Sequence, residues 1–363
     1  MSGPNQGNVK APLDSKGQGD PIRIGIIGMG KMGLLHMGLF NSIGPSKVVA
    51  ISEKQDMILT SLKQFVKNVD FYKDYQEMTS RTDIDAVIIT TPTFLHKEMI
   101  IDALSKNKAV FVEKPLAKTY GECREIMGHV GHRVTSVGYC RRFLATYRKI
   151  KETIDSGILG MPLAFEGSIN VNMVRKQTKG WQYSLESGGG GVTIDLGCHL
   201  IDIIHYLLGD FKEVSAVKSN FFSRSVEDFL MGTARMKNDA IGSIHASWSY
   251  GGSRYPEMGI QIEFENGRIE ATDRDLSITM ADKGDSKGQH NYWTKQQLAY
   301  PVPINLAGPE YTLEDIHFIE CIKGSKESMC SFHQSTKTNL VIDSLYRSAE
   351  LDKPIVIASE AGE

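Results

Sequence analysis

Short apolar runs alternate with segments of helix length over the first 140 residues, and no other feature restricts the fold as much. Residues 22–27 form an apolar run that is long enough for a buried strand and too short for a helix. Runs of the same kind recur at 47–52, 85–90, 109–112 and 133–138. The helix-length segments between them are 32–40, 55–67, 95–106 and 120–129. Apolar strands that alternate with helices predict βαβ units, and therefore a parallel sheet with helices on both faces.

Beyond residue 140 this alternation stops, and strand-like runs follow one another. Five such runs lie at 213–221, 229–236, 241–249, 259–265 and 268–271. Helices are expected before and after them, at 146–156, 193–208, 312–322 and 335–351. The pair Asn266-Gly267 separates the last two runs and is typical of a two-residue hairpin turn. Consecutive strands with helices at either end predict an α+β second domain, and 363 residues are enough for about two domains.

Charge and composition exclude several classes of protein. Residues 1–20 hold four glycines and two prolines and lack the apolar core of a secretory signal, so they are expected to form a disordered tail. Lys plus Arg total 41 against 43 Asp plus Glu, and this mixed balance predicts neither a nucleic acid nor a membrane surface as partner. No apolar run approaches the ~20 residues of a membrane span. The five cysteines are scattered and never form a CxxC pair, as expected for reduced thiols of a cytoplasmic protein without a metal site.

A glycine-rich motif follows the first apolar run directly and begins a helix. Gly28-Met29-Gly30-Lys31-Met32-Gly33 is G-x-G-x-x-G, in which the glycines allow a tight turn, a close approach of backbone to pyrophosphate, and close helix–strand packing. Glu53 ends the second run, 20 residues past Gly33, where a carboxylate accepts hydrogen bonds from an adenosine ribose. The motif and Glu53 together predict a dinucleotide site. Glu53 would repel a 2′-phosphate and favours NAD, whereas the ammonium of Lys54 would accommodate NADP.

Two further groups of residues indicate a chemical site. Glu113-Lys114-Pro115 follows the run at 109–112, at the sheet edge where ligands bind, and the proline holds Lys114 in an extended conformation. On the helix expected at 193–208, Asp195 and His199 are four residues apart and therefore within contact range. A carboxylate beside an imidazole orients and tunes a general base. The alternatives are a surface lysine before a loop proline and an amphipathic helix with its polar face in water.

The sequence resembles the family of glucose–fructose oxidoreductase and inositol dehydrogenase (the Gfo/Idh/MocA family). The resemblance spans about residues 22–357 and is carried by the glycine motif at 28–33, TTPTFLH at 90–96, VEKPLA at 112–117, GYCRRF at 138–143 and GGGGVTIDLGCH at 188–199. It implies a Rossmann dinucleotide-binding domain at 21–140. It also implies an α+β domain at 141–363 for substrate binding and oligomerisation, whose large open sheet is mostly antiparallel. The implied activity is NAD(P)-dependent hydride transfer at a hydroxyl-bearing carbon of a sugar, cyclitol or nucleotide sugar.

The same resemblance assigns roles to individual residues. His199 would take the proton of the substrate hydroxyl, Lys114 would stabilise charge on that oxygen, and Asp195 would position the pair. Four more residues would line the nicotinamide half of the cofactor site: Thr91, Pro92, His96 and Glu113. Three would contact substrate, with ordinary surface or core roles as the alternatives: Arg142, Trp181 and Tyr183.

Two questions of function and assembly stay open at this point. The family includes redox-neutral enzymes, in which bound NAD assists elimination or glycoside cleavage, and a non-catalytic NAD(P) sensor would keep the same fold. The complete set of Lys114, Asp195 and His199 argues against a sensor. Along 241–250, serines and His245 alternate with apolar residues, so one side of the strand is polar and rich in small side chains. That side would form a two-fold interface in a homodimer or homotetramer, with a solvated face as the alternative.

Overall fold

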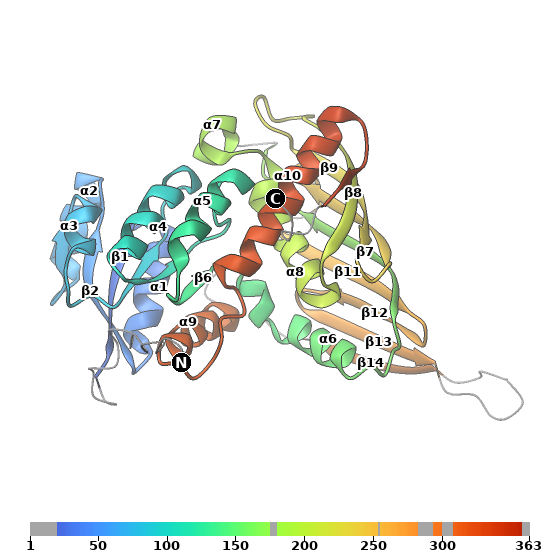
Figure 1. Cartoon of the computed structure of the whole chain (residues 1–363), viewed down its shortest axis with the longest axis horizontal. Coiled ribbons are helices and arrows are strands. Elements are labelled where there is room, and N and C mark those ends of the chain that lie inside the picture. Colours follow the sequence, from blue (N-terminus) through green and yellow to red (C-terminus); the bar gives the residue numbers. More distant parts are fainter. Residues whose placement is uncertain (1–19, 175–179, 253–254, 282–292, 300–307, 358–363) are drawn as a thin grey trace, which may run out of the picture.

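The computed structural model describes residues 20–174, 180–252, 255–281, 293–299 and 308–357, and these form two sheets with helices between and around them (Figure 1). The tail was expected at residues 1–20, of which residues 1–19 lie outside the described residues. The sequence predicted a first domain built on a parallel sheet and a second, α+β domain with an open sheet. Both are confirmed.

The N-terminal sheet is parallel throughout, with the strand order β3-β2-β1-β4-β5-β6. Its strands are β1 (Ile22–Ile27), β2 (Ser46–Ser52), β3 (Asp70–Tyr72), β4 (Ala86–Ile89), β5 (Ala109–Val112) and β6 (Thr135–Val137). Its helices are α1 (Lys31–Ser42), α2 (Asp56–Phe65), α3 (Tyr75–Thr79), α4 (His96–Ser105) and α5 (Tyr120–Val130). The order reverses between β1 and β4, and ligands of such sheets bind at this point, beyond the carboxyl ends of the strands.

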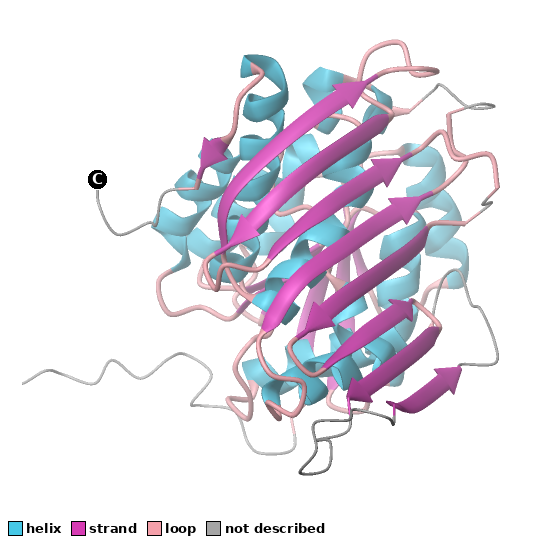
Figure 2. Ribbon diagram, turned by 90° about the vertical axis from the view of Figure 1, so that its right-hand side faces the viewer, coloured by secondary structure: helices cyan, strands magenta, loops and turns pink. Residues whose placement is uncertain are grey.

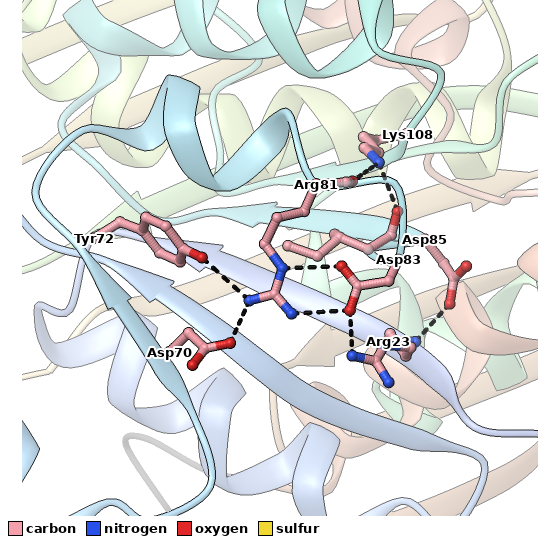
Figure 3. Close-up of polar contacts among 8 residues, drawn as sticks. Arg23, Asp70, Tyr72, Arg81, Asp83, Asp85 and Lys108 are labelled. Carbon is pink, nitrogen blue, oxygen red and sulfur yellow. Dashed lines mark hydrogen bonds and ion pairs between the residues drawn. The ribbon is translucent and has the colours of Figure 1, made fainter.

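Charged side chains gather at the opposite edge of this sheet, where the strands begin (Figure 3). Arg81 donates from Nε to Asp83 (2.9 Å) and from Nη1 to Asp70 (2.6 Å), and Arg23 also pairs with Asp83. Nζ of Lys108 donates to the carbonyl oxygen of Arg81 (2.5 Å). The hydrogen bonds from Arg81 hold the pKa of Asp83 well below its usual value. These contacts join the starts of β1, β3, β4 and β5, so we assign the cluster a stabilising role away from the ligand-binding edge.

The second sheet has nine strands in the order β14-β13-β12-β11-β7-β10-β9-β8-β15. They are β7 (Pro162–Asn170), β8 (Phe211–Ser219), β9 (Phe229–Met236), β10 (Ile241–Ser247), β11 (Glu257–Phe264), β12 (Gly267–Thr272), β13 (Asp275–Ala281), β14 (Trp293–Ala299) and β15 (Ile355–Val356). Only the β7–β10 pair is parallel among the pairings of these strands. Figure 2 shows one face of the sheet without helices, with the helices behind it.

Helices α6 (Ala145–Asp155), α8 (Cys198–Leu208) and α10 (Phe332–Leu351) lie with the covered face of this sheet. Ile244, Ala246 and Trp248 are buried, and Ser243 and His245 on the alternate side are partly exposed, as the alternation predicted. Ser247 and Tyr250 depart from the prediction, because Ser247 is buried and Tyr250 is exposed. The stretch Leu185–Leu208 is long and apolar enough to cross a membrane, but 83% of its apolar window is buried inside the protein.

Helix α9 (Pro309–Ile322) returns to the first sheet although it follows the second in sequence. Phe318, Ile319 and Ile322 pack in one buried cluster with residues of β1, α1 and β5, among them Ile24 and Phe111. The division expected at residue 140 therefore separates the two sheets, while one later helix completes the core of the first.

The hairpin between β11 and β12 is present, but its two turn residues are Glu265 and Asn266 rather than Asn266 and Gly267. Gly267 is the first residue of β12 and pairs with Phe264. A Cβ at Gly267 would lie 2.3 Å from the carbonyl oxygen of Thr279 on the neighbouring strand. Close strand approach, rather than the turn, explains this glycine.

Candidate active site

A cavity of about 1190 Å³ opens at the carboxyl edge of the six-stranded sheet, beyond the ends of β1, β2, β4 and β5. Its position is the reversal point of the strand order, where dinucleotides bind in doubly wound sheets. The predicted site residues that line it are Gly28, Met29, Gly30, Lys31, Met32, Glu53, Thr91, Pro92, Glu113, Lys114, Trp181 and Asp195.

The three glycines of the turn are required for different reasons. Gly28 has φ +90°, a conformation that other residues rarely adopt. A Cβ at Gly33 would lie 2.1 Å from the carbonyl oxygen of Gly28, so α1 packs directly on the turn. A Cβ at Gly30 would meet no protein atom within 4 Å. Packing therefore does not explain Gly30, and open space beside its backbone fits a bound pyrophosphate at the N-terminus of α1.

Glu53 lies just beyond β2 and is buried against the glycine turn. Its Oε2 accepts the backbone N–H of Met29 and its Oε1 that of Gln55, both at 2.8 Å. These two bonds fix the carboxylate at the wall of the cavity. Lys54 and Lys73 line the same part of the cavity.

His96 was expected to contact the cofactor, but it does not line the cavity. Its ring is fully buried, with Nδ1 3.0 Å from the carbonyl oxygen of Pro115 and Nε2 3.0 Å from that of Thr91. Burial lowers the pKa of His96. The ring therefore lies behind the loop at 91–93 and supports it, which the sequence motif alone did not distinguish from direct contact.

Lys114 and Asp195 form an ion pair that joins the two halves of the chain. Nζ of Lys114 lies 3.0 Å from Oδ1 of Asp195 and 2.6 Å from its backbone carbonyl oxygen. Burial opposes the charged form of Lys114, but Asp195 outweighs it and raises the pKa of this lysine above its usual value. Lys114 is therefore a cation at neutral pH. The peptide bond from Lys114 to Pro115 is cis.

The expected contact between Asp195 and His199 is not formed in the described structure. The backbone over Thr193–Gly197 is a π-helical turn, and α8 begins only at Cys198, so the i, i+4 geometry of a regular helix does not apply. Asp195 contacts Lys114 instead. His199 lies edge-on to the ring of Tyr139, with centroids 6.0 Å apart, and its Nδ1 has no partner among the described atoms.

His199 is buried, and its electrostatic surroundings favour the neutral imidazole. Burial lowers the pKa of His199 well below 6.5, and the positive charges of Arg141 and Lys114 lower it further. A neutral imidazole accepts a proton, whereas an imidazolium does not.

A second cavity, of about 580 Å³, lies on the other side of the turn that carries Asp195. Leu196 and His199 line it, whereas Asp195 lines the first cavity. Side chains that the sequence analysis did not select complete its wall: Arg141, Tyr255, Asp273, Glu310 and Tyr311. Arg141 is held by a two-pronged contact, with Nε and Nη2 each 3.1 Å from a carboxylate oxygen of Asp273.

The prediction that Arg142 contacts a ligand finds no support in its position. Its guanidinium is 3% exposed and forms two hydrogen bonds with Asp202, of 2.8 and 2.7 Å. It also lies over the ring of Tyr206, 5.1 Å from the centroid. In the pair Arg141-Arg142 the sequence could not show which side chain faces the cavity, because both lie in one tight turn, Cys140–Phe143.

Of the two aromatic residues that were predicted to contact substrate, one lines a cavity and the other does not. Trp181 lines the first cavity and is 39% exposed. Tyr183 is buried and packs edge-on to Trp248, with centroids 5.4 Å apart, and it lines neither cavity. Tyr183 is therefore a core residue.

All five cysteines are unpaired and buried, and no group of three or more metal-ligating side chains occurs within the described residues.

A doubly wound sheet with a glycine turn at its reversal point, joined to a lysine–carboxylate pair and a neutral imidazole, defines a dinucleotide-dependent oxidoreductase. Two family models match the chain. The "Oxidoreductase family, NAD-binding Rossmann fold" matches residues 22–135, and the "GFO/IDH/MocA C-terminal domain" matches residues 147–270. The chain belongs to the Gfo/Idh/MocA family. The predictions of a Rossmann domain, of NAD as cofactor and of an NAD-dependent enzyme are confirmed.

Curated relatives and solved structures agree with this assignment. The chain is 26% identical over 280 residues to the myo-inositol 2-dehydrogenase of Thermotoga maritima, covering 74% of this chain and 80% of that one. It is 31% identical over 264 residues to the inositol 2-dehydrogenase/D-chiro-inositol 3-dehydrogenase of Lacticaseibacillus casei, covering 69% and 72%. A levoglucosan dehydrogenase in complex with NADH has the same fold, with a TM-score of 0.83, 23% identity, and coverage of 94% of this chain and 100% of that one.

Proposed function

We propose that the chain is an NAD-dependent dehydrogenase that oxidises a secondary hydroxyl of a cyclitol or a sugar. One observation carries the proposal: a cationic Lys114 and a neutral His199 lie on either side of one turn, between a dinucleotide cavity and a second cavity. The names of the relatives, which act on inositols, support this substrate class.

The residues of the first cavity would hold NAD, with the glycine turn at its pyrophosphate and Glu53 at its ribose. NAD supplies the hydride acceptor when it is bound there. Lys114 would donate a hydrogen bond to the reacting oxygen. An ammonium has three N–H groups, and the two acceptors that Asp195 provides leave one of them for substrate. Asp195 would hold this ammonium in place.

His199 would take the proton that the hydroxyl must lose as its carbon is oxidised. The imidazole is neutral at pH 7, and it lines the cavity that is left for substrate. The positive charge of Lys114 would at the same time stabilise negative charge on the oxygen. In this proposal the base, on α8, and the electrostatic stabiliser, in the turn after β5, would act on the same oxygen from two elements of the fold.

A panel of inositols, hexoses, anhydrosugars and nucleotide sugars, each assayed with NAD and with NADP, tests this proposal. Formation of NADH with at least one cyclitol or sugar is the expected result. Cofactor binding without turnover on the whole panel would contradict it.

Cofactor preference provides a test of Glu53 that does not depend on substrate. NAD is expected to bind more tightly than NADP, because the fixed Glu53 carboxylate would repel a 2′-phosphate. Glu53→Ala should therefore reduce the difference between the dissociation constants for NAD and NADP. Calorimetry with both cofactors measures the two dissociation constants, with Glu77→Ala, an exposed carboxylate outside the cavity, as the control. A wild-type protein that prefers NADP by about tenfold, or about 1.4 kcal/mol, would refute this role.

The helix-free face of the nine-stranded sheet is the interface that we propose for a homodimer or homotetramer. Val217 and Met231 are cross-strand partners on β8 and β9, they are 63% and 53% exposed, and Met231 pairs in turn with His245 on β10. Exposed apolar side chains on an open sheet face are typical of association surfaces. Light scattering at micromolar concentration should give at least twice the mass of the 40.2 kDa chain. Met231→Glu should lower that mass, and a monomeric wild-type protein would contradict the interface.

A further inference from the structure

His36 lies on α1, in the turn of helix that follows the glycine motif, and its ring is fully buried between two carboxylates. Nδ1 is 2.9 and 3.0 Å from the two carboxylate oxygens of Asp315 on α9. Nε2 is 3.1 Å from Oε1 of Glu113, the residue before Lys114. The ring of Phe111 packs against the imidazole, with centroids 5.0 Å apart. The function proposed above does not use His36.

Both ring nitrogens of His36 face acceptors, and this determines its protonation state. A neutral imidazole has one N–H and one lone pair, whereas an imidazolium has two N–H donors. Two carboxylate acceptors therefore match an imidazolium, although burial raises the pKa of Asp315. Burial opposes that charge, but Asp315 and Glu113 outweigh burial and raise the pKa of His36 well above 6.5.

A third carboxyl group near this cluster is Glu314, which is buried on α9 and has no partner for either carboxyl oxygen among the described atoms. Burial raises the pKa of Glu314 well above its usual value, and the neighbouring Glu113 and Asp315 raise it further. These shifts favour the protonated, neutral form of Glu314.

The Glu113 carboxylate links His36 to the turn that carries Lys114. Its Oε1 contacts His36, and its Oε2 accepts the backbone N–H of Lys114 at 3.2 Å. His36 belongs to the helix that begins at the glycine turn, and Asp315 belongs to the helix that follows the second sheet. One imidazolium thus connects the cofactor helix, the Lys114 turn and α9.

We propose that His36 is a positioning residue for Lys114: by tying Glu113 to Asp315 it fixes the Lys114 turn against the cofactor helix. This inference rests on the proposed role of Lys114. Loss of the tie would release the Glu113 carboxylate, so that the Lys114 ammonium is no longer held at the distance that catalysis needs. A displacement of about 1 Å costs about 10²-fold in rate.

The test compares His36→Gln with the double variant His36→Gln/Asp315→Asn and with the control His205→Gln. Gln keeps one donor nitrogen but loses the charge and places a carbonyl oxygen where the second donor nitrogen was. The control changes a histidine–aspartate pair that is only partly buried, His205 and Asp210 at 2.8 Å, and that lies outside both cavities. The measurements are kcat, the dissociation constant for NAD, and thermal unfolding.

For His36→Gln we expect kcat to fall about 10–100-fold, while the dissociation constant for NAD changes less than about threefold. The glycine turn should keep its shape, because Glu53 and Thr90 hold it. The added Asp315→Asn should restore thermal stability, since it removes an unpaired buried charge, without restoring kcat. His205→Gln should keep kcat within about twofold.

A kcat within twofold of wild type for His36→Gln would overturn the inference, and so would recovery of kcat together with stability in the double variant. The second result would show that His36 acts on folding alone. If Lys114→Ala itself keeps full activity, the proposed catalytic role of Lys114 fails, and the inference fails with it, whereas the proposed dehydrogenase activity is tested separately by the substrate panel. Loss of activity in Lys114→Ala but not in His36→Gln refutes only the positioning role.

Discussion

Lys114→Ala is expected to lower kcat by about 10²–10⁴, the range for losing an electrostatic stabiliser of the reacting oxygen. The Lys114 ammonium is paired with Asp195 at the wall of the dinucleotide cavity, and one of its N–H groups is left for substrate. The dissociation constant for NAD should change little, because the glycine turn and Glu53, which we propose to bind the cofactor, lie elsewhere in the cavity wall. Steady-state kinetics and calorimetry on the same preparations separate the two effects.

Lys97→Ala is the matched control for Lys114→Ala. Lys97 lies on α4 in the same domain, pairs with the exposed Glu125 at 3.0 Å and does not line either cavity. Its substitution should keep kcat within about twofold, since an exposed ion pair contributes little to stability. Full activity in Lys114→Ala would remove this lysine from the mechanism.

His199→Ala should lower kcat by a similar factor of about 10²–10⁴, because the reaction loses its proton acceptor. The wild-type enzyme should show an acid limb that this variant lacks. The pKa of His199 lies well below 6.5, so the imidazole is fully in its neutral, proton-accepting form at pH 7. As the pH falls through this lowered pKa, the imidazole becomes protonated and activity should be lost. Profiles of kcat/KM against pH for both proteins measure this difference.

His205→Gln, on the same helix as His199, controls for changes in α8 itself, and it should keep both the rate and the acid limb. A His199→Ala variant with full activity would exclude His199 as the base. An acid limb that persists unchanged in the residual activity of His199→Ala would assign that titration to another group.

The hydrophobic pattern predicted most of the first domain because buried parallel strands are continuous apolar runs. β1 and β5 begin and end where the pattern placed them, and the glycine turn follows β1 as expected. β3 was not predicted, because a three-residue strand at the sheet edge is too short to produce a pattern. β7 is central in the second sheet, yet the sequence pattern did not predict it. Its Gly167 faces Leu200 so closely that a Cβ would lie 2.8 Å away, and glycine interrupts the apolar alternation there.

The candidate site could be predicted in its residue types but not in all of its contacts. Lys114, Asp195 and Glu53 line the expected cavity, and their motifs were visible in the sequence. The π-helical turn redirected Asp195 from His199 to Lys114, and helix-wheel spacing assumes a regular helix. Contacts between residues that are far apart in the sequence could not be predicted either. The partner of Lys114 is 81 residues away and the partner of His36 is 279 residues away, and no local pattern records such distances.

The stoichiometry of NADH against oxidised product, measured with a cyclitol or sugar substrate from the panel, tests the central claim most directly. The proposed roles of Lys114 beside the dinucleotide cavity and of His199 in the second cavity predict net oxidation of a hydroxyl, with one NADH released for each carbonyl formed. Substrate consumption without net NADH would show redox-neutral chemistry assisted by bound NAD and would contradict the account.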